Sequence, residues 1–217
     1  MSGSISTKPD NALRFLGTCG VIAPISFTVI VIILGLLNPS YSHLSQGISE
    51  LGAVGAPYAI VQDANFLLTG SLIIAFAVGL QKGIGDGQGS KIGPVLLALD
   101  GGFGAVGAGI FPLPSPLHTP LSAIGVISLV IAPPFISRRL KRDFRWQSYR
   151  SYSLATGMVV VMIFLLFLFT GLFVGQDVLE PWMGVLQRML LAPLLVWIEV
   201  MAIHLLVISN QSKVRTV

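Results

Sequence analysis

Long apolar stretches separated by short polar segments dominate this chain of 217 residues. Several of the stretches approach or exceed about 20 residues, the length that an α-helix needs to cross the hydrocarbon core of a bilayer. The strands of a transmembrane barrel would alternate polar and apolar residues, and the stretches do not. The pattern therefore predicts an all-α integral membrane protein, with six transmembrane helices in a compact bundle and a single domain over residues 1–217. The spans are expected near 15–37, 58–80, 93–112, 119–137, 153–174 and 183–208.

The composition supports a membrane protein, since 53% of the residues are hydrophobic and only 10% are Asp, Glu, Lys or Arg. The apolar stretches are too long and too numerous for a cleaved signal peptide. Cys19 is the single cysteine, so an intrachain disulfide is excluded.

The basic residues are unevenly distributed, and this predicts the orientation of the chain. Twelve of the 13 Lys and Arg residues fall in the two terminal tails and in the segments 81–92 and 138–152. Because Lys and Arg are retained on the cytoplasmic side, the N- and C-termini are both expected to be cytoplasmic. The expected location is the cytoplasmic (inner) membrane of a prokaryote. The basic run RRLKR is expected to anchor a span and to contact lipid headgroups, not nucleic acid.

The polar stretch HLSQGISELGAVGAP at 43–57 is then expected on the outer side, between the first two spans. Three of its apolar residues have i, i+4, i+7 spacing and share one helical face: Leu44, Ile48 and Leu51. The spacing predicts a short helix in the outer interface. A solvated linker is the alternative, and Ser49 and Glu50 can also serve as caps of a span end.

Five ionisable side chains fall within the expected spans, where an isolated charge costs at least about 2.5 kcal/mol. They are Asp63, Asp100, Arg188, Glu199 and His204. Asp63 and Arg188 lie at similar depth in the outer half, so they are the expected ion pair. Asp100 and Glu199 lie near mid-membrane, and since three acids share one base, at least one carboxyl is expected to be neutral. His204 is expected to pack at the cytoplasmic interface.

The second span carries a polar stripe formed by Gln62, Asn65 and Thr69, which lie within about 60° of one another at about 100° per residue. Asp63 points away from this stripe. The span is therefore polar on two sides and is expected to be central in the bundle, with interhelical hydrogen bonds for Gln62 and Thr69.

Small residues in the third span predict close approach of its neighbours. One small face contains Gly101, Ala105 and Gly109, and a second contains Gly104 and Ala108. Such faces let helix backbones pack tightly in membranes.

His118 follows the proline-rich turn FPLPSPLHTP, which places it at the expected outer mouth of the bundle. It shares the outer side with Glu50, Asp63 and Arg188. A histidine with one or two carboxylates can carry out acid–base chemistry. No HExxH or CxxC spacing indicates a metal, and the sequence identifies no cofactor.

The combination of HLSQGISELGAVGAP, an asparagine in the second span, and GIFPL followed by a histidine resembles a bacterial and archaeal membrane family. That family is catalogued as domain of unknown function nine-nine-eight. The resemblance covers about residues 12–208 and implies a compact six-helix membrane protein, without an established reaction. The residues that it marks are Ser49, Glu50, Leu51, Gly52, Pro57, Asn65, Gly109, Pro112 and His118.

Three functions are consistent with these features. The first is a site open to the outer leaflet that binds or processes a lipid or small molecule. It would use Glu50, His118 and Asp63 as catalytic residues, and Ser49, Asn65, Arg188, Asp100 and Glu199 as binding residues. The second is a proton-coupled transporter of small solutes that uses the mid-membrane acids. The third is a non-catalytic accessory subunit, as a homo-oligomer or within a larger membrane complex. Membrane lipids are the expected partners in each case.

Overall fold

The computed structural model describes residues 10–210, and all the regular secondary structure of these residues is helical. Six helical segments are long and apolar enough to cross a membrane, which confirms the number of spans. The largest differences from the expected edges lie at the last two spans, which begin at Gln147 and Asp177. The elements are α1 (Asn11–Leu37), η1 (Ile48–Gly52), α2 (Ala59–Gly83), η2 (Gly85–Gly87), α3 (Ile92–Leu99), η3 (Asp100–Val106), α4 (Gly107–Ile110), α5 (His118–Leu140), α6 (Gln147–Phe169), η4 (Thr170–Val174), α7 (Gln176–Leu179), η5 (Glu180–Trp182) and α8 (Met183–Asn210).

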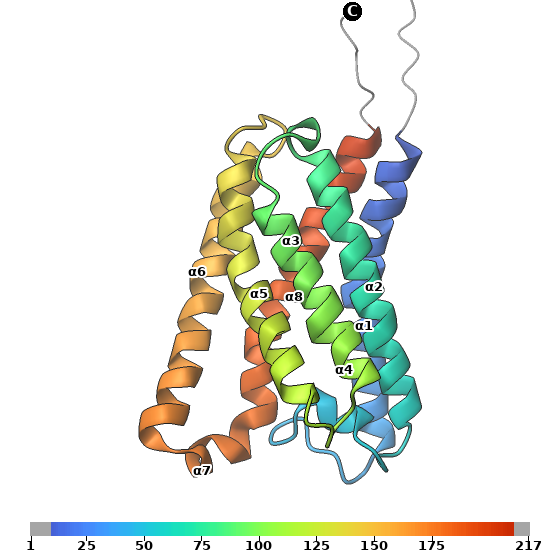
Figure 1. Cartoon of the computed structure of the whole chain (residues 1–217), viewed down its shortest axis with the longest axis vertical. Coiled ribbons are helices and arrows are strands. Elements are labelled where there is room, and N and C mark those ends of the chain that lie inside the picture. Colours follow the sequence, from blue (N-terminus) through green and yellow to red (C-terminus); the bar gives the residue numbers. More distant parts are fainter. Residues whose placement is uncertain (1–9, 211–217) are drawn as a thin grey trace, which may run out of the picture.

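The described ends of α1 and α8 lie side by side at one end of the bundle, as an even number of spans requires (Figure 1). The backbone N–H of Asp10 donates to the carbonyl oxygen of Ser209 at 3.1 Å. The loops 84–91 and 141–146 lie at this same end, which we call the basic end (Figure 1). The opposite end carries the loops 38–58, 111–117 and 175–182, whose only Asp, Glu, Lys and Arg residues are three acids; we call it the acidic end. The three acids are Glu50, Asp177 and Glu180.

One arginine of the RRLKR run is part of the core at the basic end. Arg139 is 5% exposed. Its Nη2 donates to the carbonyl oxygens of Gln81 and Ile84 at 2.7 Å each, and its Nη1 donates to the carbonyl oxygen of Ser90 at 3.1 Å and to Oε1 of Gln81. The expected anchor is therefore also a clamp, which fastens α5 to the end of α2 and to the loop before α3.

The small residues of the third span let three helices approach closely, as predicted. A Cβ atom on Gly101 would lie 2.7 Å from the carbonyl oxygen of Gly70 in α2. A Cβ on Gly104, on the other small face, would lie 3.0 Å from the Cα of Gly125 in α5. The segment η3 is a π-helical turn, a rare wide form that is found frequently at functional sites.

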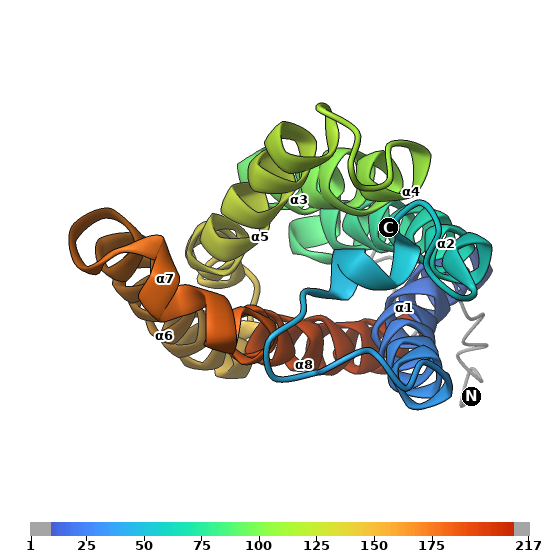
Figure 2. The same cartoon turned by 90° about the horizontal axis from the view of Figure 1, so that it is seen from below.

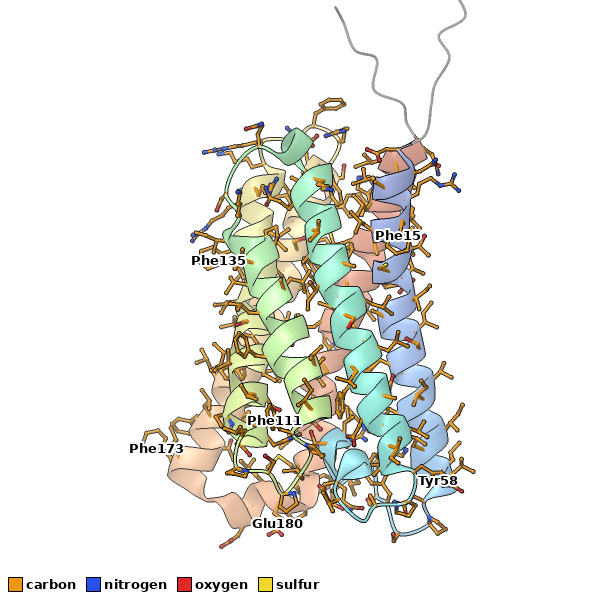
Figure 3. All side chains as sticks on the ribbon, turned by 45° about the vertical axis from the view of Figure 1, so that its right-hand side comes forward. Phe15, Tyr58, Phe111, Phe135, Phe173 and Glu180 are labelled. Carbon is orange, nitrogen blue, oxygen red and sulfur yellow. The ribbon has the colours of Figure 1, made fainter. Side chains whose placement is uncertain are left out.

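The bundle is not equally closed along its length. At the basic end α6 packs on α5 and α8: a Cβ on Gly157 would overlap the ring of Pro134, and Trp197 donates to Ser153 Oγ at 2.9 Å. Toward the acidic end α6 diverges from the other helices (Figures 1 and 2). Just beyond it, Leu172 and Phe173 are 76% and 74% exposed, and the side chain of Phe173 points away from the bundle (Figure 3).

The segment after α1 folds over the acidic end of the bundle (Figure 2). Its short 3₁₀ helix η1 is anchored by Ile48 and Leu51, which are 4% and 0% exposed and pack in a cluster with Phe27 and Phe66. The expected short helix is thus present as a single turn. Leu44 is 47% exposed, so its predicted place on the same buried face is wrong, because the helical turn begins only at Ile48.

Candidate functional site

Arg188 of α8 fastens the segment after α1 to the bundle. Its Nη1 donates to the carbonyl oxygens of Gly184, His43 and Gln46 at 2.8, 3.1 and 3.2 Å. Its Nη2 donates to the hydroxyl of Tyr41 at 2.7 Å and to Nδ1 of His43 at 2.9 Å. We call these residues, with Glu50, the Arg188 cluster.

The predicted ion pair between Asp63 and Arg188 is wrong. The two side chains do lie toward the same end of the bundle, but the donors of Arg188 are taken up by neutral oxygens and a nitrogen of the 41–47 segment. The positions of Asp63 and Arg188 along their spans correctly predicted that both lie toward the same end of the bundle. Those positions could not predict that the 41–47 segment would take up the donors of Arg188.

The bond to Arg188 fixes the protonation state of His43. A guanidinium only donates, so Nδ1 of His43 must accept, and the imidazole is neutral with its proton on Nε2. Burial lowers the pKa of His43 below its ordinary value of 6.5, and the positive charge of Arg188 lowers it further. Burial also raises the pKa of Tyr41, against the opposing hydrogen bond from Arg188.

The cluster is expected to weaken in acid. Below about pH 6.5 the unfolded chain binds a proton at His43 that the folded chain resists, so stability is present at neutral pH and falls as the pH decreases. In His43→Asn the amide oxygen can accept from Arg188 but does not titrate. We therefore expect the wild-type protein to lose more thermal stability than His43→Asn between pH 7.5 and pH 5, measured in detergent by tryptophan fluorescence. Equal acid losses in the two proteins would contradict the assigned tautomer.

Glu50, the predicted catalytic acid, has a partner for each carboxylate oxygen. Oε1 accepts from the backbone N–H of Gly47 at 2.7 Å, and Oε2 accepts from Nε2 of Gln46 at 2.9 Å. These bonds close the turn of η1, so Glu50 caps its own helical turn. It also lines an open cavity of about 600 Å³ at the acidic end, together with Glu180. Its catalytic role stays a prediction.

Asp63 and His118 are brought together at the acidic end, between α2 and the start of α5. Nδ1 of His118 lies 2.8 Å from the carbonyl oxygen of Phe111, which can only accept, so Nδ1 carries a proton. Asp63 is close enough to His118 to interact with it electrostatically, and its Oδ1 is buried without a hydrogen-bond partner among residues 10–210. A Cβ on Gly52 would lie 2.6 Å from that oxygen, so η1 covers it. His118 is 4% exposed, deeper than the expected mouth position.

Asp100 and Ser49, two predicted binding residues, line a common cavity of about 90 Å³ inside the bundle. We call it the central cavity. Asp100 is 7% exposed, and its carboxyl has no hydrogen-bond partner within the described part of the chain. Ser122 Oγ also borders the cavity and is buried without a described partner. The lining residues are Phe27, Ser49, Phe66, Thr69, Ile73, Asp100, Gly104, Ala105, Ser122, Val126, Leu129, Gln187, Leu191 and Leu195.

The local sequence explains why the carboxyl of Asp100 can occupy this place. Asp100 opens the π-helical turn η3, and Gly104 lies beside its side chain. A Cβ on Gly104 would lie 2.8 Å from Oδ1 of Asp100, so any other residue there would crowd the carboxyl.

Asn65 belongs to the buried stripe predicted on the second span. Its Nδ2 donates to the carbonyl oxygen of Phe27 and to Oε1 of Gln62, at 3.4 Å each. Thr69 donates to Oδ1 of Asn65 at 3.5 Å and borders the central cavity. The stripe therefore joins α2 to α1 and reaches the cavity through Thr69, as an interhelical hydrogen-bonding role requires.

Glu199 stands apart from the other predicted residues. It lies one helical turn beyond Leu195 on α8, and its Oε2 is buried with no hydrogen-bond partner in the range 10–210. His204 lies nearer the basic end, where its Nε2 is 2.8 Å from the carbonyl oxygen of Arg145 and its ring packs on Trp146 and Tyr149. The expected packing role of His204 is thus observed, and its place at the cytoplasmic interface stays a prediction.

Three residues of these sites carried no signal in the sequence. Tyr41 lies in the polar segment after α1, Ser122 is one of many serines, and Gln187 precedes the conspicuous Arg188. Oε1 of Gln187 accepts from the backbone N–H of Ile48 at 2.8 Å, which positions η1 over the cavity. Tyr41 and Gln187 gain their roles from the fold of the segment 38–58 against α8, and Ser122 gains its role from its place on the cavity wall.

The comparisons with known proteins identify a family. The family model described as "Protein of unknown function (DUF998)" matches residues 21–204. No curated protein and no solved structure matches the chain.

Proposed function

The chain belongs to the DUF998 family of proteins of unknown function, and we propose that it binds a lipid or lipid-like small molecule in the central cavity. It is a multi-pass membrane protein with six candidate spans. We further propose that the basic end faces the cytoplasm and the acidic end faces outward, in the inner membrane of a prokaryote. The distribution of Lys and Arg supports this orientation.

The observation that carries the proposal is the unpartnered carboxyl of Asp100 on the wall of a mainly apolar cavity. A buried polar group without a hydrogen bond costs about 1–3 kcal/mol in proteins. A hydroxyl group or another donor of a ligand would remove that cost, with Ser122 as a second polar contact. Apart from Ser49, Thr69 and Gln187, the rest of the lining is apolar or glycine and suits an apolar group.

The size of the cavity limits what enters it. Its volume of about 90 Å³ holds several water molecules. It is well below the roughly 300–1,000 Å³ of pockets that enclose a whole drug-sized ligand. We therefore expect one polar group and a short apolar part of a larger molecule inside the bundle, with the remainder in the bilayer.

We propose that a ligand enters from the bilayer on the side where α6 diverges. The cavity is lined on one side by Val126 and Leu129 of α5 and on another by Leu191 and Leu195 of α8. Toward the acidic end, α6 no longer lies against these helices (Figure 2). On this proposal a lipid approaches laterally between α5 and α8.

Filling the cavity is expected to block binding. A monoacylglycerol with a diazirine near its hydroxyl groups would be photocrosslinked to the full-length protein in nanodiscs, and the labelled peptides mapped by mass spectrometry. We expect labelling of segments that line the cavity, and its loss in Ala105→Leu. The matched control is Ala123→Leu, since Ala123 is exposed on α5. Asp100→Leu should weaken labelling about tenfold, the equivalent of one hydrogen bond. Undiminished labelling of Ala105→Leu would contradict the proposal.

Proton-coupled transport is the second candidate, favoured by two intramembrane carboxyls without hydrogen-bond partners among the described residues, Asp100 and Glu199. Its test uses proteoliposomes with an entrapped pH-sensitive dye and a potassium diffusion potential. Proton uptake that is lost in Asp100→Asn would favour transport. Uptake no greater than in empty vesicles would exclude it.

A further inference from the structure

A second cavity lies on the outer face of the α1–α8 pair, separate from the central cavity. Its volume is about 250 Å³. Three apolar side chains, Phe27, Leu191 and Leu195, border both cavities. We call the second cavity the α1–α8 groove, and its lining is Phe27, Thr28, Val31, Ile32, His43, Ile48, Arg188, Leu191, Ala192 and Leu195.

The groove is apolar over most of its lining and carries a cationic side chain, which complements a phospholipid with its apolar chains and anionic headgroup. Its side chains are apolar along α1 and α8, apart from Thr28, and its two basic residues, Arg188 and His43, both belong to the Arg188 cluster. Arg188 lies five residues after the start of α8 at Met183, about 7.5 Å along the helix axis. Thr28, Ile32 and Ala192 are exposed, so the groove is accessible from the bilayer.

Arg188 forms no direct ion pair with the described residues, although Glu50 of the same cluster acts electrostatically on its partner Tyr41. All five hydrogen bonds of Arg188 go to neutral acceptors. No carboxylate oxygen of residues 10–210 lies within 4.0 Å of its nitrogens; the ion pair found among these residues joins Arg145 and Asp143. The Nε–H of Arg188 has no protein acceptor within the same range. His43 cannot act as a counter-ion to Arg188, since its imidazole is neutral.

We propose that the α1–α8 groove binds one acyl chain of a membrane phospholipid, whose phosphodiester lies against Arg188. A cation at this depth in a bilayer is costly without a counter-ion, and a phospholipid provides the anion at the position where its chains begin. The guanidinium is the side chain best suited to phosphate oxygens, and its Nε–H remains free to donate. The groove and the central cavity share the wall formed by Phe27, Leu191 and Leu195, but they can be tested separately. Asp100 and Ala105 do not line the groove, and Arg188 and Ala192 do not line the central cavity.

The test measures phospholipid retention by native mass spectrometry of the full-length protein, delipidated in detergent and titrated with dioleoyl phosphatidylglycerol. We expect one tightly retained phospholipid. Ala192→Phe fills the groove while leaving every residue of the Arg188 cluster unchanged, and it should reduce the bound fraction about tenfold or more. Its matched control is Val196→Phe, four residues along α8, where the side chain is 58% exposed and lies outside the groove. That control should retain the phospholipid.

Separate experiments test the role of the Arg188 charge and the chemical class of the bound anion. Arg188→Gln should lower retention as Ala192→Phe does; if Arg188→Gln does not fold, Ala192→Phe decides alone. Oleate, which offers a carboxylate on the same chain, should not displace the phospholipid at equal concentration, and displacement by oleate would overturn the assignment to a phosphodiester. Wild-type retention in Ala192→Phe would overturn the site itself. Ala105→Leu should leave retention unchanged, so failure here and failure of the proposed central site can be told apart.

Discussion

Replacing Arg139 by alanine is expected to lower the free energy of unfolding by about 3–5 kcal/mol. The guanidinium donates hydrogen bonds to three backbone carbonyl oxygens and to the side-chain oxygen of Gln81, and Arg139 is 5% exposed. Its removal leaves those acceptors buried and unpaired and opens the contact between α5 and the end of α2. Unfolding in mixed micelles with increasing fractions of sodium dodecyl sulfate would give the difference.

Arg138, the neighbouring arginine, is the matched control, because its replacement removes the same charge from the same basic run without removing the clamp. Arg138 is exposed, and its guanidinium lies 5.1 Å from the ring centroid of Phe135. Arg138→Ala removes the same charge and a cation–π contact worth about 0.5–1 kcal/mol at an exposed site. A similar loss of stability in both variants would show that the basic end is held by its net charge and not by the clamp.

Gly101→Ala is expected to destabilise the bundle by about 2–3 kcal/mol. The added Cβ would lie 2.7 Å from the carbonyl oxygen of Gly70 and 2.9 Å from Cγ1 of Ile74, so α2 and η3 must move apart. The same detergent titration measures the effect. In addition, the shift would disturb the adjacent Asp100, so monoacylglycerol labelling should fall in this variant.

Gly102→Ala, one residue along the chain, is the matched control. Its added Cβ would have a single neighbour at 4.0 Å, the Cδ1 of Ile74. Because alanine has a better helix propensity than glycine, this variant should be unchanged or more stable by up to about 1 kcal/mol. Equal destabilisation by the two alanines would indicate that η3 needs glycine for its backbone and not for close packing.

The spans and the tight glycine contacts could be predicted because both depend on residues that are close together in the sequence. Apolar length gives the spans, and the spacing of Gly101 and Gly104 gives the two packing faces. The burial of Arg139 was also accessible in principle. It lies three residues after Ile136, which is 0% exposed, and so shares its helical face, whereas Arg138 is turned about 100° away.

The partners of the site residues could not be predicted, because they depend on how loops fold over the helix ends. Arg188 meets backbone carbonyls of the 41–47 segment, and backbone groups carry no sequence signal of their own. Ser49 and Asp100 share a cavity only because η1 folds over the end of the bundle and η3 is a π-helical turn. Helical depth predicted which residues lie in the outer half, but not which of them meet.

The adjacency of the first and last helices has a consequence for the order of assembly. Among the six spans, α1 is synthesised before the other five, and one of its two main neighbours, α8, is synthesised after them. Two glycines of α1 pack against that late partner: a Cβ on Gly17 would lie 2.9 Å from Leu206, and one on Gly20, which also faces Phe76 of α2, would lie 2.7 Å from the Cβ of Ala202. A chain that stops before residue 183 therefore leaves an open seam along α1. That seam would distinguish a truncated chain from a finished one to the proteases that survey the membrane.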